Sequence, residues 1–196
     1  MTSHTCGSVY GYAGRGLRGD TAWAANDQVV QVGLRGEIAT EEVLNSLAAL
    51  PGGPSVIHDL TIPGSSANVD HAVVAGTTVY LIDSKRWAPG TFWRTRKHTY
   101  RGTHKFPAAS KRTLNLALSR VRDHLDGHGV RGVRLVPIIA IWPTRKNPKL
   151  RLWPANLMRA DLARMVPADI LSAMIGRSLP RPADPRVVAA LVQLTK

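Results

Sequence analysis

Two aspartates and a lysine, Asp70, Asp83 and Lys85, have the types and order that metal-dependent phosphodiester hydrolysis needs. Opposed carboxylates on neighbouring strands repel each other by roughly 0.2–1 kcal/mol, and by more when they are buried. A divalent cation removes that repulsion, and oxygen ligands that leave room for water favour Mg²⁺ or Mn²⁺. Such a metal acidifies water and polarises a phosphate. A neighbouring lysine can hold the attacking water or stabilise charge at phosphorus.

The position of these residues depends on a predicted β-hairpin. Two runs rich in β-branched residues, 68–75 and 78–85, flank Gly76-Thr77, which fits a two-residue hairpin loop. Extending the pairing outward from that loop places Asp70 opposite Asp83. Because side chains alternate along a strand, both acids and the lysine then share one face, provided that the register does not slip. A lone Asp-X-Lys triplet is more often a surface ion pair, but here an apolar run precedes it and an aspartate opposes it.

The remaining pattern predicts an α/β fold with a mixed central sheet flanked by helices. Further helices and strands are expected as follows: helices at 37–50, 108–125, 155–165, 168–175 and 185–194, and strands at 55–60 and 133–141. Residues 1–33 are rich in glycine, lack apolar periodicity and are interpreted as a flexible basic arm. We therefore expect this arm, a core over 34–152 and a helical C-terminal extension over 153–196.

Charge is the most informative part of the composition. Lys and Arg number 26 against 13 Asp and Glu, a net charge of +13. Nucleic acid is the expected partner, because neutralising phosphates releases counterions. Anionic membranes and acidic proteins would also attract such a chain, and a basic protein without a polyanionic partner is a further alternative.

Other features of the sequence indicate a compartment. The longest apolar stretch, 133–142, is interrupted and shorter than the roughly 20 residues of a bilayer span, so no membrane partner is expected. Residues 1–10 lack the pattern of a signal peptide. A single cysteine, Cys6, excludes a disulfide framework or a thiolate zinc site within one chain. These observations predict a cytoplasmic protein.

A second group of residues has the composition of a nucleic-acid contact surface. Residues 86–106 interleave basic and aromatic side chains, which suits phosphate contacts and base stacking. The alternative is a solvated loop whose aromatic rings lie on the core. The residues expected to contact nucleic acid are Arg86, Trp87, Trp93, Arg94, Arg96, Lys97, Arg101, Lys105, Lys111 and Arg112.

Five short motifs carry a resemblance to a known family. They are Gly36-Glu37 at a helix start, His58-Asp59-Leu60, Ile62-Pro63-Gly64-Ser65, Asn68-Val69-Asp70-His71, and the run from Tyr80 through Asp83-Ser84-Lys85 to Trp87. In this order they resemble the nuclease-related domain (NERD) of the PD-(D/E)XK nuclease superfamily, over about residues 33–142. The resemblance implies a restriction-endonuclease-like core, a metal held by Asp70 and Asp83, and Lys85 acting at the water or the phosphate.

The resemblance also adds a residue and exposes a departure. It brings Glu37 into the site from the first helix, whereas the residues alone explain an acid there equally well by the helix dipole. The family often has a glutamine in the helix after the active strand, but Lys111-Arg112-Thr113 stands at about that place. This departure bears on water positioning or substrate contact rather than on the metal site.

Together these features predict an endonuclease that depends on Mg²⁺ (or Mn²⁺) and cleaves phosphodiester bonds, above all in DNA. Two alternatives stay open: a basic DNA-binding module with a degenerate nuclease site, and an RNA-binding or RNA-processing protein. A double-strand cut usually needs two sites, which favours a homodimer.

Overall fold

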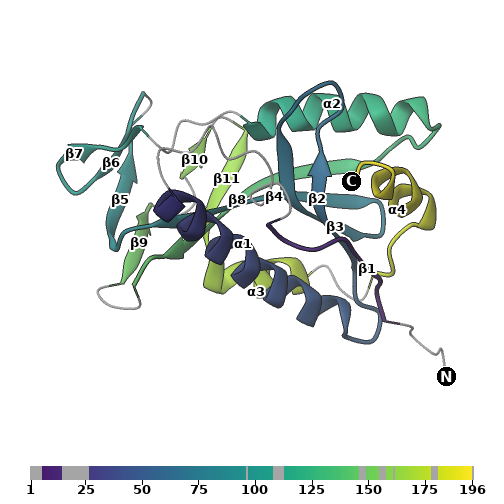
Figure 1. The fold of residues 1–196 in the computed structure, drawn as a ribbon, viewed down its shortest axis with the longest axis horizontal. Helices are drawn as coiled ribbons and strands as arrows, with labels where there is room; N and C mark the ends of the chain where they lie inside the picture. Colours follow the sequence, from purple (N-terminus) through teal and green to yellow (C-terminus); the bar gives the residue numbers. More distant parts are fainter. Residues whose placement is uncertain are drawn as a thin grey trace.

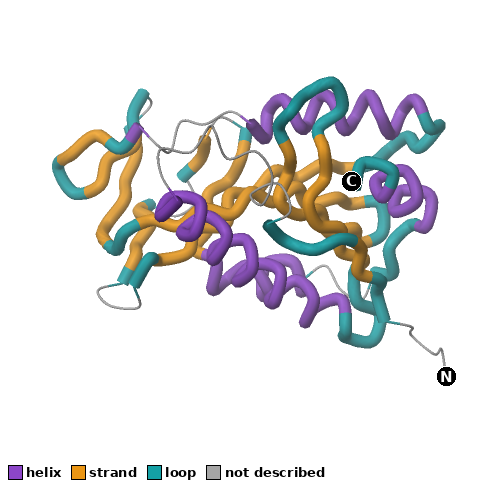
Figure 2. Tube along the Cα trace, viewed as in Figure 1, coloured by secondary structure: helices purple, strands orange, loops and turns teal. Residues whose placement is uncertain are grey.

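The computed structural model describes residues 6–14, 27–95, 97–107, 113–145, 149–154, 158–160, 162–177 and 181–195. In this part of the chain a mixed sheet with the order β1-β2-β3-β4-β8-β11-β10 lies between helices on both faces (Figures 1 and 2). A second, smaller sheet, β7-β6-β5-β9, projects from one end of the molecule (Figure 1).

The elements have the following bounds. The large sheet contains β1 (Val9–Tyr10), β2 (Ser55–Thr61), β3 (Asn68–Ala75), β4 (Thr78–Trp87), β8 (Arg134–Pro143), β10 (Arg159–Ala160) and β11 (Ala163–Pro167). The small sheet contains β5 (Gly90–Arg94), β6 (Thr99–Arg101), β7 (His104–Lys105) and β9 (Leu150–Trp153). The helices are α1 (Asp27–Ala48), α2 (Thr113–Gly127), α3 (Leu171–Gly176) and α4 (Pro185–Val192), with a 3₁₀ turn at Ala168–Ile170.

The predicted hairpin is formed by β3 and β4. Ala75 pairs with Thr78 around the two-residue loop, and the antiparallel register continues to the pair of His71 and Ile82. Gly76 has a φ of 59°, a left-handed conformation that glycine adopts at little cost in a tight turn. The loop length thus sets the register that the sequence predicts. On its other side β4 pairs in parallel with β8 along its whole length.

Alternation along the strands divides the apolar core between the two faces of the large sheet. Leu81 packs with residues of α2 and α4, whereas the next residue, Ile82, packs with Leu44 of α1 and Leu171 of α3. Figure 2 shows these helices on opposite sides of the strands. Since both faces are covered, the strands in the middle of the sheet are buried over most of their length, and polar residues lie toward their ends.

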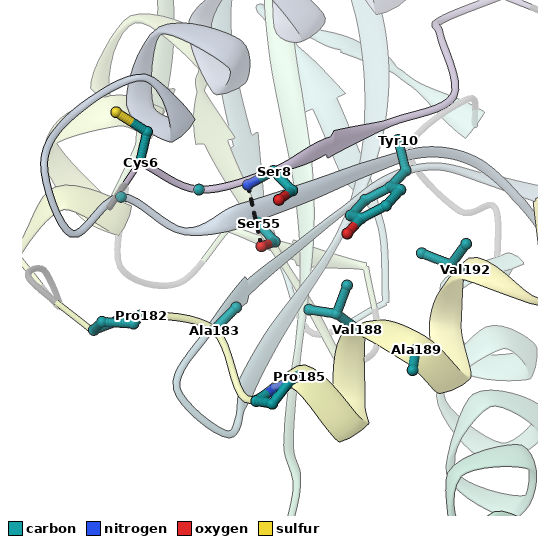
Figure 3. Close-up of a pocket in the computed structure, with 12 residues that line it drawn as sticks. Cys6, Ser8, Tyr10, Ser55, Pro182, Ala183, Pro185, Val188, Ala189 and Val192 are labelled. Atoms are coloured by element: carbon teal, nitrogen blue, oxygen red, sulfur yellow. Dashed lines mark hydrogen bonds between the residues drawn. The ribbon is translucent and has the colours of Figure 1, made fainter. Parts of the chain in front are cut away.

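The expectation of a flexible arm over residues 1–33 does not hold for two parts of it. β1 pairs in parallel with β2, and α1 begins at Asp27. The N–H of Gly7 donates to the carbonyl of Ala48 at 2.8 Å, which fixes this segment to the end of α1. The same N-terminal segment, together with α4, also lines a cavity of about 380 Å³ (Figure 3). A two-residue strand has no periodicity to detect, so the sequence pattern missed it.

The C-terminal part also differs from expectation. The helix expected over 155–165 is wrong where the structure describes it, because 163–167 form β11, which pairs in parallel with β8, and 159–160 form β10. β11 is apolar apart from Arg164, and a short apolar segment of this kind cannot be told from part of a helix by its sequence pattern. The helices expected at 168–175 and 185–194 are confirmed within a few residues. Among the described residues, no helix is long and apolar enough to span a bilayer.

Candidate functional site

Asp70 and Asp83 lie where the pairing of the hairpin ends. His71 and Ile82 form its last pair, and the same register continued by one residue brings the two aspartates side by side. Asp70 is buried, and its Oδ2 atom accepts a hydrogen bond of 2.6 Å from the backbone N–H of Ser84. Burial, followed by repulsion from Asp83, raises the pKa of Asp70 to about 7. The two carboxylates therefore stand close enough for the charge of Asp83 to oppose the ionisation of Asp70.

Lys85 completes this group from the same strand. Its Nζ atom lies 2.6 Å from Oδ2 of Asp83 and donates a longer bond of 3.4 Å to the carbonyl of Ser84. Burial lowers the pKa of Lys85, but the neighbouring Asp83, Asp70 and Glu37 outweigh it and raise the pKa overall. The ammonium group is therefore held charged at the edge of the acidic pair.

Glu37 reaches the same group from α1. It is buried, and its Oε2 atom accepts a hydrogen bond of 3.0 Å from the N–H of Gly14. Burial, and then the charge of Asp70, raise the pKa of Glu37 to about 9, although Lys85 and Gly14 act in the opposite direction. The structure thus brings together all four predicted catalytic residues.

Two small residues of α1 hold the helix against β4. A Cβ atom on Gly36 would lie 2.9 Å from Cγ of Arg86, so glycine permits the close approach that delivers the next residue, Glu37. One turn later, the Thr40 hydroxyl accepts hydrogen bonds of 2.8 Å from Oγ of Ser84 and from Nε1 of Trp142. Thr40 thereby ties α1 to both β4 and β8, a role that the sequence pattern missed.

Asp59 is a further acid at this place that the sequence reasoning did not assign to the site. It lies in β2 between two residues that pair with β3, and the register places it beside Asp70. It is buried with a φ of 55°, unusual for a residue other than glycine, and accepts a hydrogen bond of 2.5 Å from Nδ2 of Asn68. Its charge contributes to the raised pKa of Asp70 and of Glu37. Its place in the His58-Asp59-Leu60 motif was the available signal.

Beside the acids, His58 and His71 form a buried pair. Their Nδ1 atoms are 2.7 Å apart, and Nε2 of His58 lies 3.0 Å from Oδ1 of Asn45. Burial lowers the pKa of His58 to about 4 and that of His71 well below its usual range. Both rings are therefore neutral near pH 7. His58 then donates from Nε2 to Asn45 and accepts at Nδ1 from His71, whose own Nε2 is left as a buried acceptor with no partner among the described residues.

The residues expected to contact nucleic acid fall into four groups. Trp87 does not fit the expectation, because it is 5% exposed and packs against Phe92 and Phe106 with ring centroids 4.8 Å apart. Others lie on or next to the small sheet: Trp93, Arg94, Lys97, Arg101 and Lys105. Arg86 donates to the carbonyls of Pro143 and Thr144, so it links β4 to the end of β8. Arg96, Lys111 and Arg112 lie outside the described residues.

The donor set of the site suits a hard divalent cation. Within the described ranges no three His, Cys, Asp or Glu side chains converge as a ready-made metal cage. Mg²⁺, however, is commonly bound by one or two carboxylates, and water and substrate phosphate complete its shell. The raised pKa of Asp70 marks a carboxylate pair that a cation would relieve. Asp70 and Asp83 are thus the residues that fit this role.

The mixed sheet, flanked by helices and carrying acids at the open end of a central hairpin, defines the restriction-endonuclease-like class of α/β folds. Among protein families, the one described as the nuclease-related domain (NERD) matches residues 32–141, which is more than half of the chain. The protein belongs to this family, as its motifs predict. Neither the curated proteins nor the solved structures contain a match.

Proposed function

We propose that this protein is a nuclease that uses Mg²⁺ or Mn²⁺ to hydrolyse phosphodiester bonds in DNA. The observation that supports it most directly is the buried Asp70 beside the ion pair of Asp83 and Lys85. Membership of the nuclease-related family agrees with this chemistry. The net charge of +13 favours a polyanionic substrate.

Each of the four residues has a defined part in this proposal. Asp70 and Asp83 would hold the cation, which supplies an acidified water and a polarised phosphate when bound. Lys85 keeps its proton and donates to the attacking water or to a phosphate oxygen, where negative charge develops in the transition state. Glu37 would orient the water from the side of α1. Burial raises its pKa, and the positive charge of Lys85 offsets that rise only in part.

The experiment is a cleavage assay on linear, circular and single-stranded DNA and on RNA, with Mg²⁺, Mn²⁺ or EDTA. The wild type is compared with Asp83→Ala and with Asp123→Ala, a matched change of an exposed acid on α2. Metal-dependent cutting that is lost only in Asp83→Ala is the expected result. Cutting that survives in Asp83→Ala would overturn the assignment of the site.

A second candidate function is a DNA-binding module with an inactive site. The 2.6 Å ion pair favours it, because Lys85 already neutralises one of the two carboxylates that would hold the metal. The same assay separates the two functions. DNA binding without cutting under any metal condition, by the wild type and both variants, would establish the module.

A further inference from the structure

The small sheet continues the strand pair that carries the candidate site. β4 and β8 run in parallel as far as the pair of Trp87 and Pro143. After short connections the same two chain segments pair again in parallel, as β5 and β9, and β6 and β7 extend this second sheet on one side (Figure 1). The small sheet therefore follows the Lys85 end of β4 after only a few residues of chain.

The two faces of the small sheet differ. Phe92 of β5 and Leu152 of β9 are paired neighbours and both are buried. Phe92 packs against Trp87 and Phe106, with ring centroids 4.8 and 5.0 Å away, so this face rests on the core. Because side chains alternate along a strand, the residues next to Phe92 and Leu152 point to the opposite, outer face.

The outer face carries one row of side chains that crosses all four strands. Trp93 pairs with Tyr100 on one side and with Trp153 on the other, and Tyr100 pairs with Lys105. The Trp93 and Tyr100 rings are stacked, with centroids 4.5 Å apart and planes inclined by 12°. Trp153 is 66% exposed and takes part in none of the ring contacts among the described residues. We call Tyr100, Trp93 and Trp153 the aromatic row.

Charge around the aromatic row is of one sign. The segments that build the small sheet, 86–107 and 143–154, contain no Asp or Glu. Lys105 stands in the row itself. Arg151 precedes Trp153 by two residues on β9, so its side chain points to the same outer face, and it is exposed. Rows of aromatic rings edged by cations stack bases and contact phosphates without regard to sequence. A duplex offers such a surface its backbone but not the faces of its bases.

We propose that the outer face of the small sheet binds single-stranded DNA, with unpaired bases stacked on the aromatic row and phosphates held by Lys105 and Arg151. This inference rests on the proposed function and specifies its substrate: DNA with an unpaired segment. Residues 85 to 93 span at most roughly 27 Å when extended. A stacked strand advances about 3.4 Å per nucleotide, so a strand on the row reaches Lys85 within about eight nucleotides.

The test measures binding in EDTA, so that no cutting is needed for the readout. Labelled oligo(dT), oligo(rU) and a blunt DNA duplex are titrated with the full chain. Trp153→Ala should weaken oligo(dT) binding about five- to 150-fold, the range of one lost stacking contact. It should leave duplex binding nearly unchanged. Because Trp153 is exposed, the change does not disturb the core.

Two further variants show whether the ring itself is responsible. Trp153→Phe keeps an aromatic face and should retain most of the oligo(dT) affinity, whereas Trp153→Leu should lose it. Leu162→Ala removes another exposed apolar side chain, 61% accessible, in the turn between β10 and β11, and should have no effect.

Three results would overturn the inference: wild-type oligo(dT) affinity in Trp153→Ala, an equal loss for the duplex, or an affinity for oligo(rU) that matches or exceeds that for oligo(dT). Failure of the nuclease proposal is recognised separately. In that case oligo(dT) binding depends on Trp153 as expected, but the wild type cuts no substrate with Mg²⁺ or Mn²⁺.

Discussion

β4 serves two regions with opposite physical character. At its Asp83–Lys85 end it contributes to an acidic region, in which the charges of Asp83, Asp70 and Glu37 act on Lys85. A few residues further along the chain, the small sheet offers basic and aromatic side chains and no acid. The acidic region lowers the stability of the fold, because burial opposes the ionisation of carboxyl groups such as Glu37 and Asp70. The small sheet leaves its basic side chains in contact with solvent, so they lower the stability of the fold very little.

The difference indicates a division of labour between chemistry and affinity. Groups that must hold a cation benefit from burial, since repulsion between them is relieved only when the cation arrives. Groups that bind a polyanion act through charge and stacking at the surface. If this division is correct, variants in the two regions change different measurements.

The largest effect is expected from Lys85→Ala. Removing the ammonium beside Asp83 should lower the turnover by about 100- to 1,000-fold, the range for losing one donor that stabilises transition-state charge. Mn²⁺ binding, measured by calorimetry, and oligo(dT) affinity should stay close to the wild type. Arg131→Ala, a change of an exposed cation far from both strands of the hairpin in sequence, serves as the control. A turnover equal to that of the wild type would remove Lys85 from the mechanism.

Thr40→Val tests whether α1 positions the acidic region. The change leaves the hydroxyl of Ser84 and the indole N–H of Trp142 without their acceptor, which should reduce the free energy of unfolding by about 1–3 kcal/mol in urea titrations. Thr40→Ser keeps the hydroxyl and should restore most of that stability. Equal stability of Thr40→Val and the wild type would show that these hydrogen bonds do not hold the helix.

Asp70→Asn tests the folding cost of the acidic region. The folded pKa of Asp70, about 7, lies above its ordinary 3.8, so the unfolded chain releases this proton first as the pH rises. In EDTA the wild type should therefore lose stability from about pH 4 to pH 7, and the raised pKa of Glu37 extends the loss toward pH 9.

At pH 8 the asparagine variant should be more stable than the wild type in EDTA by about 1–3 kcal/mol, measured by thermal unfolding. Addition of Mn²⁺ should raise the midpoint of the wild type but not that of the variant. Asp123→Asn, the matched change at an exposed acid, should alter neither midpoint. A less stable Asp70→Asn would show that the hydrogen bond to Ser84 outweighs the repulsion.

The smallest effect is expected in the basic region. Arg151→Gln on β9 removes one cation of the outer face of the small sheet, so the slope of log affinity against log salt should fall by about one, with turnover at saturating DNA unchanged. An unchanged slope would show that this arginine does not contact phosphate. A fall in turnover at saturating DNA would show that the small sheet also contributes to the chemical step, and not to affinity alone.

Local signals predicted the hairpin and its acids but not the contacts that surround them. The two-residue loop at Gly76-Thr77 was enough to set the register of Asp70 and Asp83. The hydrogen bond from Gly14 to Glu37 joins residues far apart in sequence, and no local pattern predicts it. Thr40 looks like an ordinary helix residue until β4 and β8 are placed beside it.

Burial was the other quantity that local patterns did not predict. Trp87 has the same basic and aromatic neighbours in the sequence as Trp93, yet the first packs in the core and the second lies on the outer face of the small sheet. Their strands belong to different sheets, and tertiary structure decides which ring is covered. Likewise β11 is a short segment that is apolar apart from Arg164, so its sequence fits a helix as well as a strand, and only its pairing with β8 identifies it as a strand.

The buried pair of His58 and His71 gives the acidic region a built-in spectroscopic reporter. A proton shared between two imidazole nitrogens 2.7 Å apart, and shielded from solvent, exchanges slowly and resonates well downfield of ordinary amide protons in an NMR spectrum. His58 and His71 adjoin Asp59 and Asp70 in the chain, so a cation bound at the carboxylates would displace that resonance. Occupancy could then be followed by one isolated signal, without labels, substrate or turnover.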